Sequence, residues 1–415
     1  MSDQERTSGG VQMNAGVTAQ QTVGEQELDV DRPLRLAVIG AGARSEIAGH
    51  AVETGDGVIV AVADPSAAAR ERAAELFGTE AELFAGHREL IAGAADIDAA
   101  FVTSPDHTHA EVAIDLLNAG IAVYLEKPLA IDVADADAIL AAAAASGTPL
   151  YVGHNMRHMA VVQTMRDIIE RGDIGEVKAV WCRHFVGNGG DYYFKDWHAE
   201  RAKSNGLLLQ KGAHDIDIIH WLAGGYSDLV TGMGGLTLYG GIDDRRDNSD
   251  RSMPDWFSLD AWPPLAQREL NPVIDVEDLS MVTMHLDNGV FASYQQCHYT
   301  PDYWRNYTVI GTEGRLENFG DSDGAIVRVW NRRTTYNPAG DAEYTVLGDE
   351  GGHGDADRLT VAEFVRFVRE GSATTTSAVA ARNAVATAVA ATESLRDGSR
   401  PRAVPAVDAE VAARL

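Results

Sequence analysis

The chain of 415 residues is poor in cysteine, in basic residues and in long apolar runs. Its two cysteines, Cys182 and Cys297, cannot build a disulfide framework and lack the paired spacing of a zinc site, so we predict no metal and a reducing, cytoplasmic location. Only 34 basic residues face 62 acidic ones, a net charge of −28 that argues against nucleic acid and anionic membranes as partners. No apolar run approaches the roughly 18 residues that span a membrane.

The length predicts more than one domain, because single hydrophobic cores stop growing at about 250–300 residues. Residues 1–31 are polar with little apolar periodicity, and we predict a disordered tail there. Apolar strands alternate with helical stretches over residues 32–155, which is typical of βαβ units and predicts a doubly wound parallel sheet. The strands are expected at 34–39, 58–63, 99–102, 121–125 and 149–152.

The pattern changes in residues 156–400, where consecutive strand-like runs predict an α+β domain with a mostly antiparallel sheet. Asp287-Asn288-Gly289 is typical of a hairpin turn between two of these strands. A helix is expected over 206–223, ended by Gly224-Gly225. Residues 240–272 are expected to be an irregular insertion, which at that length is either functional or disordered. Its tryptophans, Trp256 and Trp262, favour partial order, for example as an oligomer contact. Residues 401–415 are expected to be a C-terminal tail.

A glycine-rich turn joins the first predicted strand to a helix, which is the context that a dinucleotide-binding turn requires. Gly40 permits the tight turn, Gly42 lets the backbone approach a pyrophosphate, and the small Ser45 takes the third glycine position. An ordinary glycine turn of an α/β protein is the alternative. The predicted cofactor contacts here are Gly40, Gly42, Ala43, Arg44 and Ser45.

Asp64 ends the second predicted strand, 22 residues after Gly42. A carboxylate in this place accepts hydrogen bonds from ribose hydroxyls and repels a 2′-phosphate. Since no arginine follows directly, we predict NAD rather than NADP as the cofactor. The alternative is an aspartate that only caps the next helix.

Two further turns follow predicted strands of this half. Residues 104–109 form a polar turn, and we expect Ser104, Pro105 and His107 or His109 to border the cofactor, unless Asp106 merely caps a helix. Glu126-Lys127-Pro128 lies at the carboxyl edge of the sheet, where doubly wound folds hold their ligands. Lys127 can meet a substrate hydroxyl there, and its pKa should fall near a positively charged nicotinamide, which suits acid–base catalysis. We expect Glu126 and Lys127 to contact the cofactor and Lys127 to be catalytic.

The predicted helix 206–223 carries a second candidate base. His214 and Asp217 are three residues apart and share a helix face, so His214 could be a base held by a carboxylate, or a structural histidine. Residues 191–198 combine aromatic faces with charges, as sugar sites do, or form a buried aromatic cluster. The predicted substrate contacts are Lys127, Arg157, Asp196, Trp197, Gln210, Lys211, His214 and Asp217.

Taken together, the segments 37–42, 104–110, 126–128 and 214–217 resemble the glucose–fructose oxidoreductase / inositol dehydrogenase / MocA family over residues 34 to about 400. The resemblance implies a Rossmann domain followed by a domain whose open sheet serves dimer or tetramer formation. It implies NAD or NADP chemistry on a carbohydrate or polyol substrate. Lys127, often in a cis Lys-Pro peptide, and His214 would be its catalytic residues.

Gln210 departs from the family pattern, because dehydrogenase members commonly carry an aspartate four residues before the histidine. A glutamine cannot act as a base, so either Lys127 and His214 suffice or the reaction is not a simple alcohol oxidation. Some relatives keep NAD bound and cleave glycosides by transient C3 oxidation and elimination, which is the alternative enzyme. A non-catalytic NAD-binding regulator is the alternative outside enzymes, and the intact Lys127 and His214 argue against it.

Overall fold

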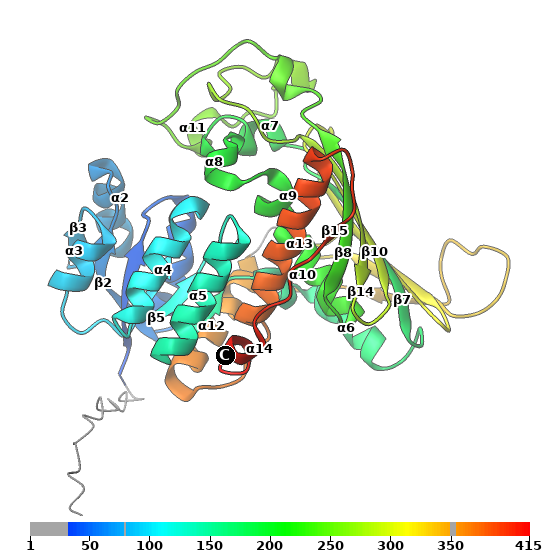
Figure 1. Cartoon of the computed structure of the whole chain (residues 1–415), viewed down its shortest axis with the longest axis horizontal. Helices are drawn as coiled ribbons and strands as arrows, with labels where there is room; N and C mark the ends of the chain where they lie inside the picture. Colours follow the sequence, from blue (N-terminus) through cyan, green and yellow to red (C-terminus); the bar gives the residue numbers. More distant parts are fainter. Residues whose placement is uncertain (1–31, 79, 349–353) are drawn as a thin grey trace, which may run out of the picture. The chain divides into compact units, whose positions relative to one another are not determined.

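The computed structural model describes residues 32–78, 80–348 and 354–415, so the tail predicted at 1–31 lies outside the described residues. From Pro33 onward the chain forms one compact unit built on two sheets (Figure 1). One is a six-stranded parallel sheet and the other a nine-stranded, mostly antiparallel sheet, which confirms the predicted fold class. No helix in the described part of the chain is long and apolar enough to cross a membrane.

The parallel sheet has the strand order β3-β2-β1-β4-β5-β6, the doubly wound order of dinucleotide-binding folds. Its central strands are almost wholly buried because helices cover both faces, which is why they read as continuous apolar runs. The edge strand β3 was not predicted, since it is short and largely exposed. The strands are β1 (Leu34–Ile39), β2 (Gly57–Ala63), β3 (Glu82–Phe84), β4 (Ala99–Val102), β5 (Ala122–Leu125) and β6 (Leu150–Val152).

Helices begin where short polar side chains cap them. Ser66 Oγ accepts a hydrogen bond from Ala69 N to start α2, and Asp132 does the same from Asp135 N for α5. The helix after the glycine turn begins as the 3-10 helix η1 (Ala43–Ala48) before α1. The helices of this half are α1 (Gly49–Glu53), α2 (Ala67–Phe77), α3 (His87–Gly93), η2 (Asp106–Thr108), α4 (His109–Asn118) and α5 (Val133–Ser146).

The nine-stranded sheet has the order β14-β13-β12-β11-β7-β10-β9-β8-β15, and only β7 and β10 pair in parallel. The predicted hairpin turn joins β9 to β10, and Gly289 adopts the positive φ of +82° that the turn requires. The strands are β7 (Val177–Phe185), β8 (Ser227–Gly235), β9 (Leu279–Leu286), β10 (Phe291–Cys297), β11 (Trp304–Gly311), β12 (Arg315–Phe319), β13 (Ile326–Trp330), β14 (Ala342–Thr345) and β15 (Arg402–Ala403).

Helices cover one face of this sheet. The single helix predicted over 206–223 is in fact two helices, α9 and α10, because the helix is interrupted at Lys211. Gly224 then ends α10 in the left-handed conformation. The helices of this half are η3 (Asn155–His158), α6 (Ala160–Glu170), α7 (Gly189–Tyr193), η4 (Trp197–Ala199), α8 (Arg201–Ser204), α9 (Leu207–Gln210), α10 (Gly212–Ala223), α12 (Gly354–Glu370), α13 (Ala378–Arg396) and α14 (Ala409–Ala412).

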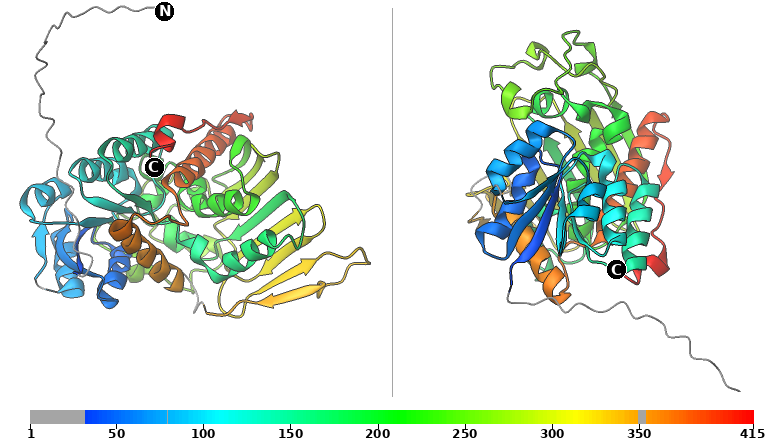
Figure 2. Two further views of the ribbon diagram at one scale, coloured as in Figure 1. Left: turned by 90° about the horizontal axis from the view of Figure 1, so that it is seen from below. Right: turned by 90° about the vertical axis from the view of Figure 1, so that its left-hand side faces the viewer.

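The C-terminal helices return to the N-terminal half. α13 lies between α5 and β8, as Figure 2 shows, and its Ala384, Val385 and Ala388 share one core with Leu140 and Ile216. Residues 401–415, expected as a tail, supply β15, which pairs with β8, and α14, which packs near α5. The C-terminal segment therefore joins the two halves of the fold, through the contacts of α13, β15 and α14.

The insertion at 240–272 has a core of its own with α7. Tyr239 and Leu270 pack with Val186, Tyr193 and Phe194. The insertion contains α11 (Met253–Trp256) and η6 (Pro264–Ala266), and η5 (Tyr239–Gly241) leads into it. Figure 1 shows α11 beside α7, at the top of the view.

Candidate active site

A cavity of about 640 Å³ opens at the carboxyl ends of β1, β2, β4 and β5, the edge at which the sequence predicts ligand binding. The C-terminal half closes it with residues from η4, α8, α9 and the insertion. From the N-terminal half its lining comprises Gly40, Gly42, Ala43, Arg44, Asp64, Thr103, Ser104, Pro105, Asp106, His109, Glu126 and Lys127.

The glycine turn forms a cradle for a phosphate group. Gly40 has a φ of +93°, and a Cβ there would lie 2.5 Å from the backbone of Ser104, so only glycine fits between the two loops. A Cβ on Gly42 would meet no atom within 4 Å, which leaves its backbone open to a ligand. Ser45 does not line the cavity; its hydroxyl donates to Gly42 O at 2.7 Å and fixes the turn. These residues fit a dinucleotide pyrophosphate.

Asp64 is held at the end of β2 by two backbone amides. Its Oδ2 accepts from Ala41 N and its Oδ1 from Ser66 N, both at 2.8 Å. Arg70 Nη1 donates to the carbonyl oxygens of Asp64 and Pro65, at 2.6 and 3.1 Å. The side chains of Asp64 and Arg70 therefore lie together at the place where the sequence predicts binding of the adenosine ribose.

Arg44 lines the cavity, but its guanidinium binds protein carboxylates. Nε donates to Glu126 at 2.7 Å, and the terminal nitrogens bind Asp357 of α12 at 2.6 and 2.9 Å. Burial alone would lower the pKa of Arg44, but Glu126 and Asp357 raise it. Arg44 and Glu126 thus join the rim of the cavity to the C-terminal half.

The two histidines of the 104–109 turn differ. His109 is buried, with Nδ1 2.8 Å from Pro128 O and Nε2 3.0 Å from Ser104 O, so it ties two lining loops together. His107 is exposed and does not line the cavity, and its ring lies 6.4 Å from that of Trp197. His109 supports the walls of the cavity, whereas His107 lies outside them.

Lys127 presents a perturbed amine to the cavity. Its peptide bond with Pro128 is cis, as the resemblance implies, and its Nζ donates to Gln210 O at 3.1 Å. Burial lowers the pKa of Lys127, and the nearby charge of Lys211 lowers it further, while Asp106 opposes the shift. The amine is therefore easier to deprotonate than that of an exposed lysine.

Gln210 and Lys211 stand at the break between α9 and α10. Gln210 lines the cavity at 6% exposure, and its Oε1 has no hydrogen-bond partner among the described residues, so it can receive a substrate hydroxyl. Lys211 does not line the cavity. Burial, then the charge of Arg305, lowers the pKa of Lys211 to about 8.

His214, Asp217 and Arg157 lie behind the lining. His214 is buried in α10, with its ring 6.0 Å from that of His154. Asp217 accepts from Arg157 Nε and Nη2 at 2.8 and 2.7 Å, and Arg157 Nη1 donates to Thr375 O at 2.7 Å. Asp217 therefore holds Arg157, and neither of them lines the cavity among the described residues.

Residues 196–198 do line the cavity. The rings of Trp197 and His198 stack at 3.8 Å, and His198 Nδ1 lies 2.5 Å from Asp196 Oδ1. Sequence reasoning missed the insertion as a source of lining residues, although its unusual length was the available signal. Those residues are Asp247, Asn248, Ser249, Arg251, Ser252, Met253, Trp256 and Asn271.

A buried carboxylate holds α10 against the nine-stranded sheet. Asp215 binds His184 Nδ1 at 2.9 Å, Arg305 Nε at 3.0 Å and Tyr294 Oη at 2.9 Å, and also accepts from Tyr307 Oη. Burial would raise the pKa of Asp215, but Arg305 and His184 bring it well below its usual range. Neither the composition nor the spacing of the sequence pointed to this group.

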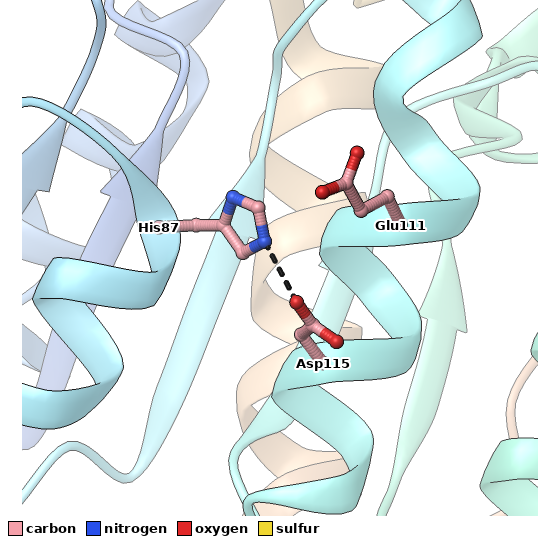
Figure 3. A group of neighbouring side chains, drawn as sticks. All are labelled: His87, Glu111 and Asp115. Carbon is pink, nitrogen blue, oxygen red and sulfur yellow. Dashed lines mark hydrogen bonds and ion pairs between the residues drawn. The ribbon is translucent and has the colours of Figure 1, made fainter.

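One cluster away from the cavity has metal-binding side chains. His87, Glu111 and Asp115 bring their donor atoms within 4.8 Å of one another, from two neighbouring helices (Figure 3). Arg88 already binds both carboxylates at 2.8 Å, and His87 Nε2 lies 3.0 Å from Asp115. Ion pairs within the protein thus account for this cluster.

The doubly wound strand order and the glycine cradle at the carboxyl edge of the sheet are typical of the nucleotide-binding class of proteins. The family model for the oxidoreductase NAD-binding Rossmann fold matches residues 34–154, and the model for the oxidoreductase C-terminal alpha/beta domain matches residues 166–404. The chain therefore belongs to the Gfo/Idh/MocA oxidoreductase family, which confirms the resemblance and predicts a nicotinamide cofactor.

Similar proteins include YteT of Bacillus subtilis (strain 168), 26% identical over 63% of this chain and 70% of the relative. Inositol 2-dehydrogenase of Rhizobium meliloti (strain 1021) is 30% identical over 52% of this chain and 62% of its own length, less than two thirds. Among solved structures, levoglucosan dehydrogenase in complex with NADH and levoglucosan has a TM-score of 0.73 at 19% identity, covering 90% of this chain and 100% of that one. At that identity the structural likeness shows the fold alone.

Proposed function

We propose that this chain is an NAD-dependent oxidoreductase that moves a hydride between nicotinamide and a hydroxyl-bearing carbon of a sugar, inositol or related polyol. The observation that carries the proposal is the meeting of Lys127 and Gln210 in one cavity with the Gly42 turn. The names of the relatives, an inositol 2-dehydrogenase and a levoglucosan dehydrogenase, support this substrate class.

The protein's own groups would handle the proton and orient the substrate, while the bound nicotinamide would exchange the hydride. The largely buried amine of Lys127, with its lowered pKa, can take the hydroxyl proton. The Oε1 atom of Gln210 would accept a hydrogen bond from a second hydroxyl. His214, which the sequence suggests as a second base, lies behind the lining, so the proposal assigns the hydroxyl proton to Lys127.

The test is to incubate the purified protein with NAD and a panel of sugars, polyols and aryl glycosides, recording NADH absorbance and free aglycone. We expect NADH to accumulate in proportion to the substrate consumed, and the Lys127→Met variant to serve as the inactive control. Binding of NADH without turnover of any panel member would contradict the proposal and favour a non-catalytic NAD-binding protein.

Gln210 favours a second candidate, a glycoside hydrolase that transfers hydride from C3 to NAD, eliminates the aglycone from C1 with the proton of C2, adds water across the resulting C1–C2 double bond and returns the hydride to C3. The amide of Gln210 lies in the cavity at the position where dehydrogenases of the family commonly carry a carboxylate. Turnover of a nitrophenyl glycoside in deuterated water separates the two. Release of nitrophenol with deuterium at C2 and only catalytic NAD would replace the dehydrogenase proposal.

We also propose a homodimer or homotetramer formed through the open face of the nine-stranded sheet. Trp181, Met281 and Phe291 are 52, 40 and 63% exposed on the face opposite the buried Val180 and the helices. An apolar face of this kind is typical of protein interfaces. Sedimentation velocity should show the Phe291→Glu variant dissociating, while the exposed Leu259→Glu control stays assembled; a wild-type monomer would refute the proposal.

A further inference from the structure

The insertion lines the same cavity as the glycine turn, although it belongs to the C-terminal half. Arg251, Ser252 and Met253 share the cavity lining with Gly42 and Asp64. We propose that residues 247–256 form a second wall of the nucleotide site, so that NAD binds between this segment and the Rossmann domain and dissociates slowly. The inference rests on the nicotinamide cofactor of the proposed function and adds residues to its binding site.

The segment is anchored before any ligand arrives. Asn248 Nδ2 donates to Lys195 O at 2.9 Å and to Glu269 O at 2.8 Å. Arg251 Nη2 donates to Asn248 Oδ1 at 2.5 Å and to Glu269 Oε2 at 2.8 Å. Because these contacts already hold the wall in place, nucleotide binding pays little ordering entropy there, which favours high affinity.

The short helix α11 directs the wall toward the Rossmann domain. Trp256 is buried and its Nε1 donates to Asp191 O at 2.8 Å, so the end of α11 is fixed on α7. Ser252 and Asp255 form a reciprocal capping box at its start. Ser252 and Met253 line the cavity together with Asp64 at the end of β2, so the segment faces the adenosine end of the predicted site.

The chemistry of the wall suits a dinucleotide. Arg251 lines the cavity; Asn248 and Glu269 hold its guanidinium through Nη2, and no described residue accepts a hydrogen bond from its Nε. A guanidinium matches phosphate or ribose oxygens. Met253 is half-buried at the cavity, and its polarisable thioether can cover the face of an aromatic base.

The experiment measures the release of NADH from the full chain, and needs no knowledge of the substrate. NADH bound to the protein is displaced with excess NAD in a stopped-flow instrument, and its fluorescence reports the dissociation rate. The variants are Arg251→Gln, which keeps an amide near Glu269, and Met253→Ala. The matched control is Leu265→Ala, which lies in the same insertion, is 63% exposed and does not line the cavity. Asp64→Ala serves as the variant of the Rossmann wall.

We expect NADH to leave each wall variant about tenfold faster than the wild type, with little change in association, because contact losses mostly raise the dissociation rate. The Leu265→Ala control should match the wild type. In hydrogen exchange, NADH should protect residues 247–256 and leave the β9–β10 turn unchanged. If NADH leaves Arg251→Gln and Met253→Ala at the wild-type rate, or if NADH does not protect residues 247–256, the inference is overturned while the proposed function stands. Failure of the wild type to bind NADH overturns both.

Discussion

The ionisation of Lys211 should make the free energy of unfolding of the wild type depend on pH, and the Lys211→Met variant should lack this contribution. The pKa of Lys211 is about 8 in the folded chain, because burial and the charge of Arg305 disfavour its ammonium form. In an unfolded chain a lysine titrates at about 10.4. Between these values the unfolded state binds more protons, so the free energy of unfolding rises with pH.

The size of the effect follows from these two pKa values. Burial of the ammonium group lowers the free energy of unfolding by about 3 kcal/mol at about pH 7, and by about 1 kcal/mol at about pH 9.5. The wild type should therefore gain about 2 kcal/mol over Lys211→Met between the two conditions. Titrations common to both proteins cancel in this comparison.

Urea unfolding at the two pH values, followed by circular dichroism, measures the effect. Lys178→Met is the matched control, because the side chain of Lys178 is 52% exposed on β7 and pairs with Glu176. Its stability difference from the wild type should not change with pH. An equal difference between wild type and Lys211→Met at both pH values would show that the Lys211 ammonium is not desolvated in the fold. Removing Lys211 should also raise the pKa of Lys127 and shift the pH profile of turnover upward.

Two further predictions concern the cavity itself. Lys127→Met should keep its affinity for NADH in a fluorescence titration but lose about 10²- to 10⁴-fold in kcat, as removal of a general acid–base group does, and near-normal turnover would make Lys127 structural. The wild type should bind NAD more tightly than NADP, and Asp64→Ala should narrow the preference, since Arg70 remains beside the ribose site. Calorimetric titration of both cofactors tests this, and tighter NADP binding by the wild type would refute it.

Much of the N-terminal half could be predicted from the sequence, because its features are local. The buried strands show as apolar runs, and the turns at Gly40, Asp64 and Lys127 follow those strands directly, so their common edge follows from the parallel topology. The hairpin at Gly289 is local in the same sense, since a two-strand turn is encoded in its own few residues.

Only the tertiary structure decided which distant groups meet. Arg44 binds Asp357, 313 residues away, and Asp215 gathers partners from three strands; no periodicity encodes such pairs. The sequence predicted His214 and Lys211 as substrate contacts, but both lie behind the lining of the cavity among the described residues. The helix is interrupted at Lys211, between α9 and α10. The length and the tryptophans of the insertion were visible in the sequence, but its place over the cavity arises from packing against α7. Local patterns determined the elements and the turns between them, while contacts across the fold determined the walls of the site.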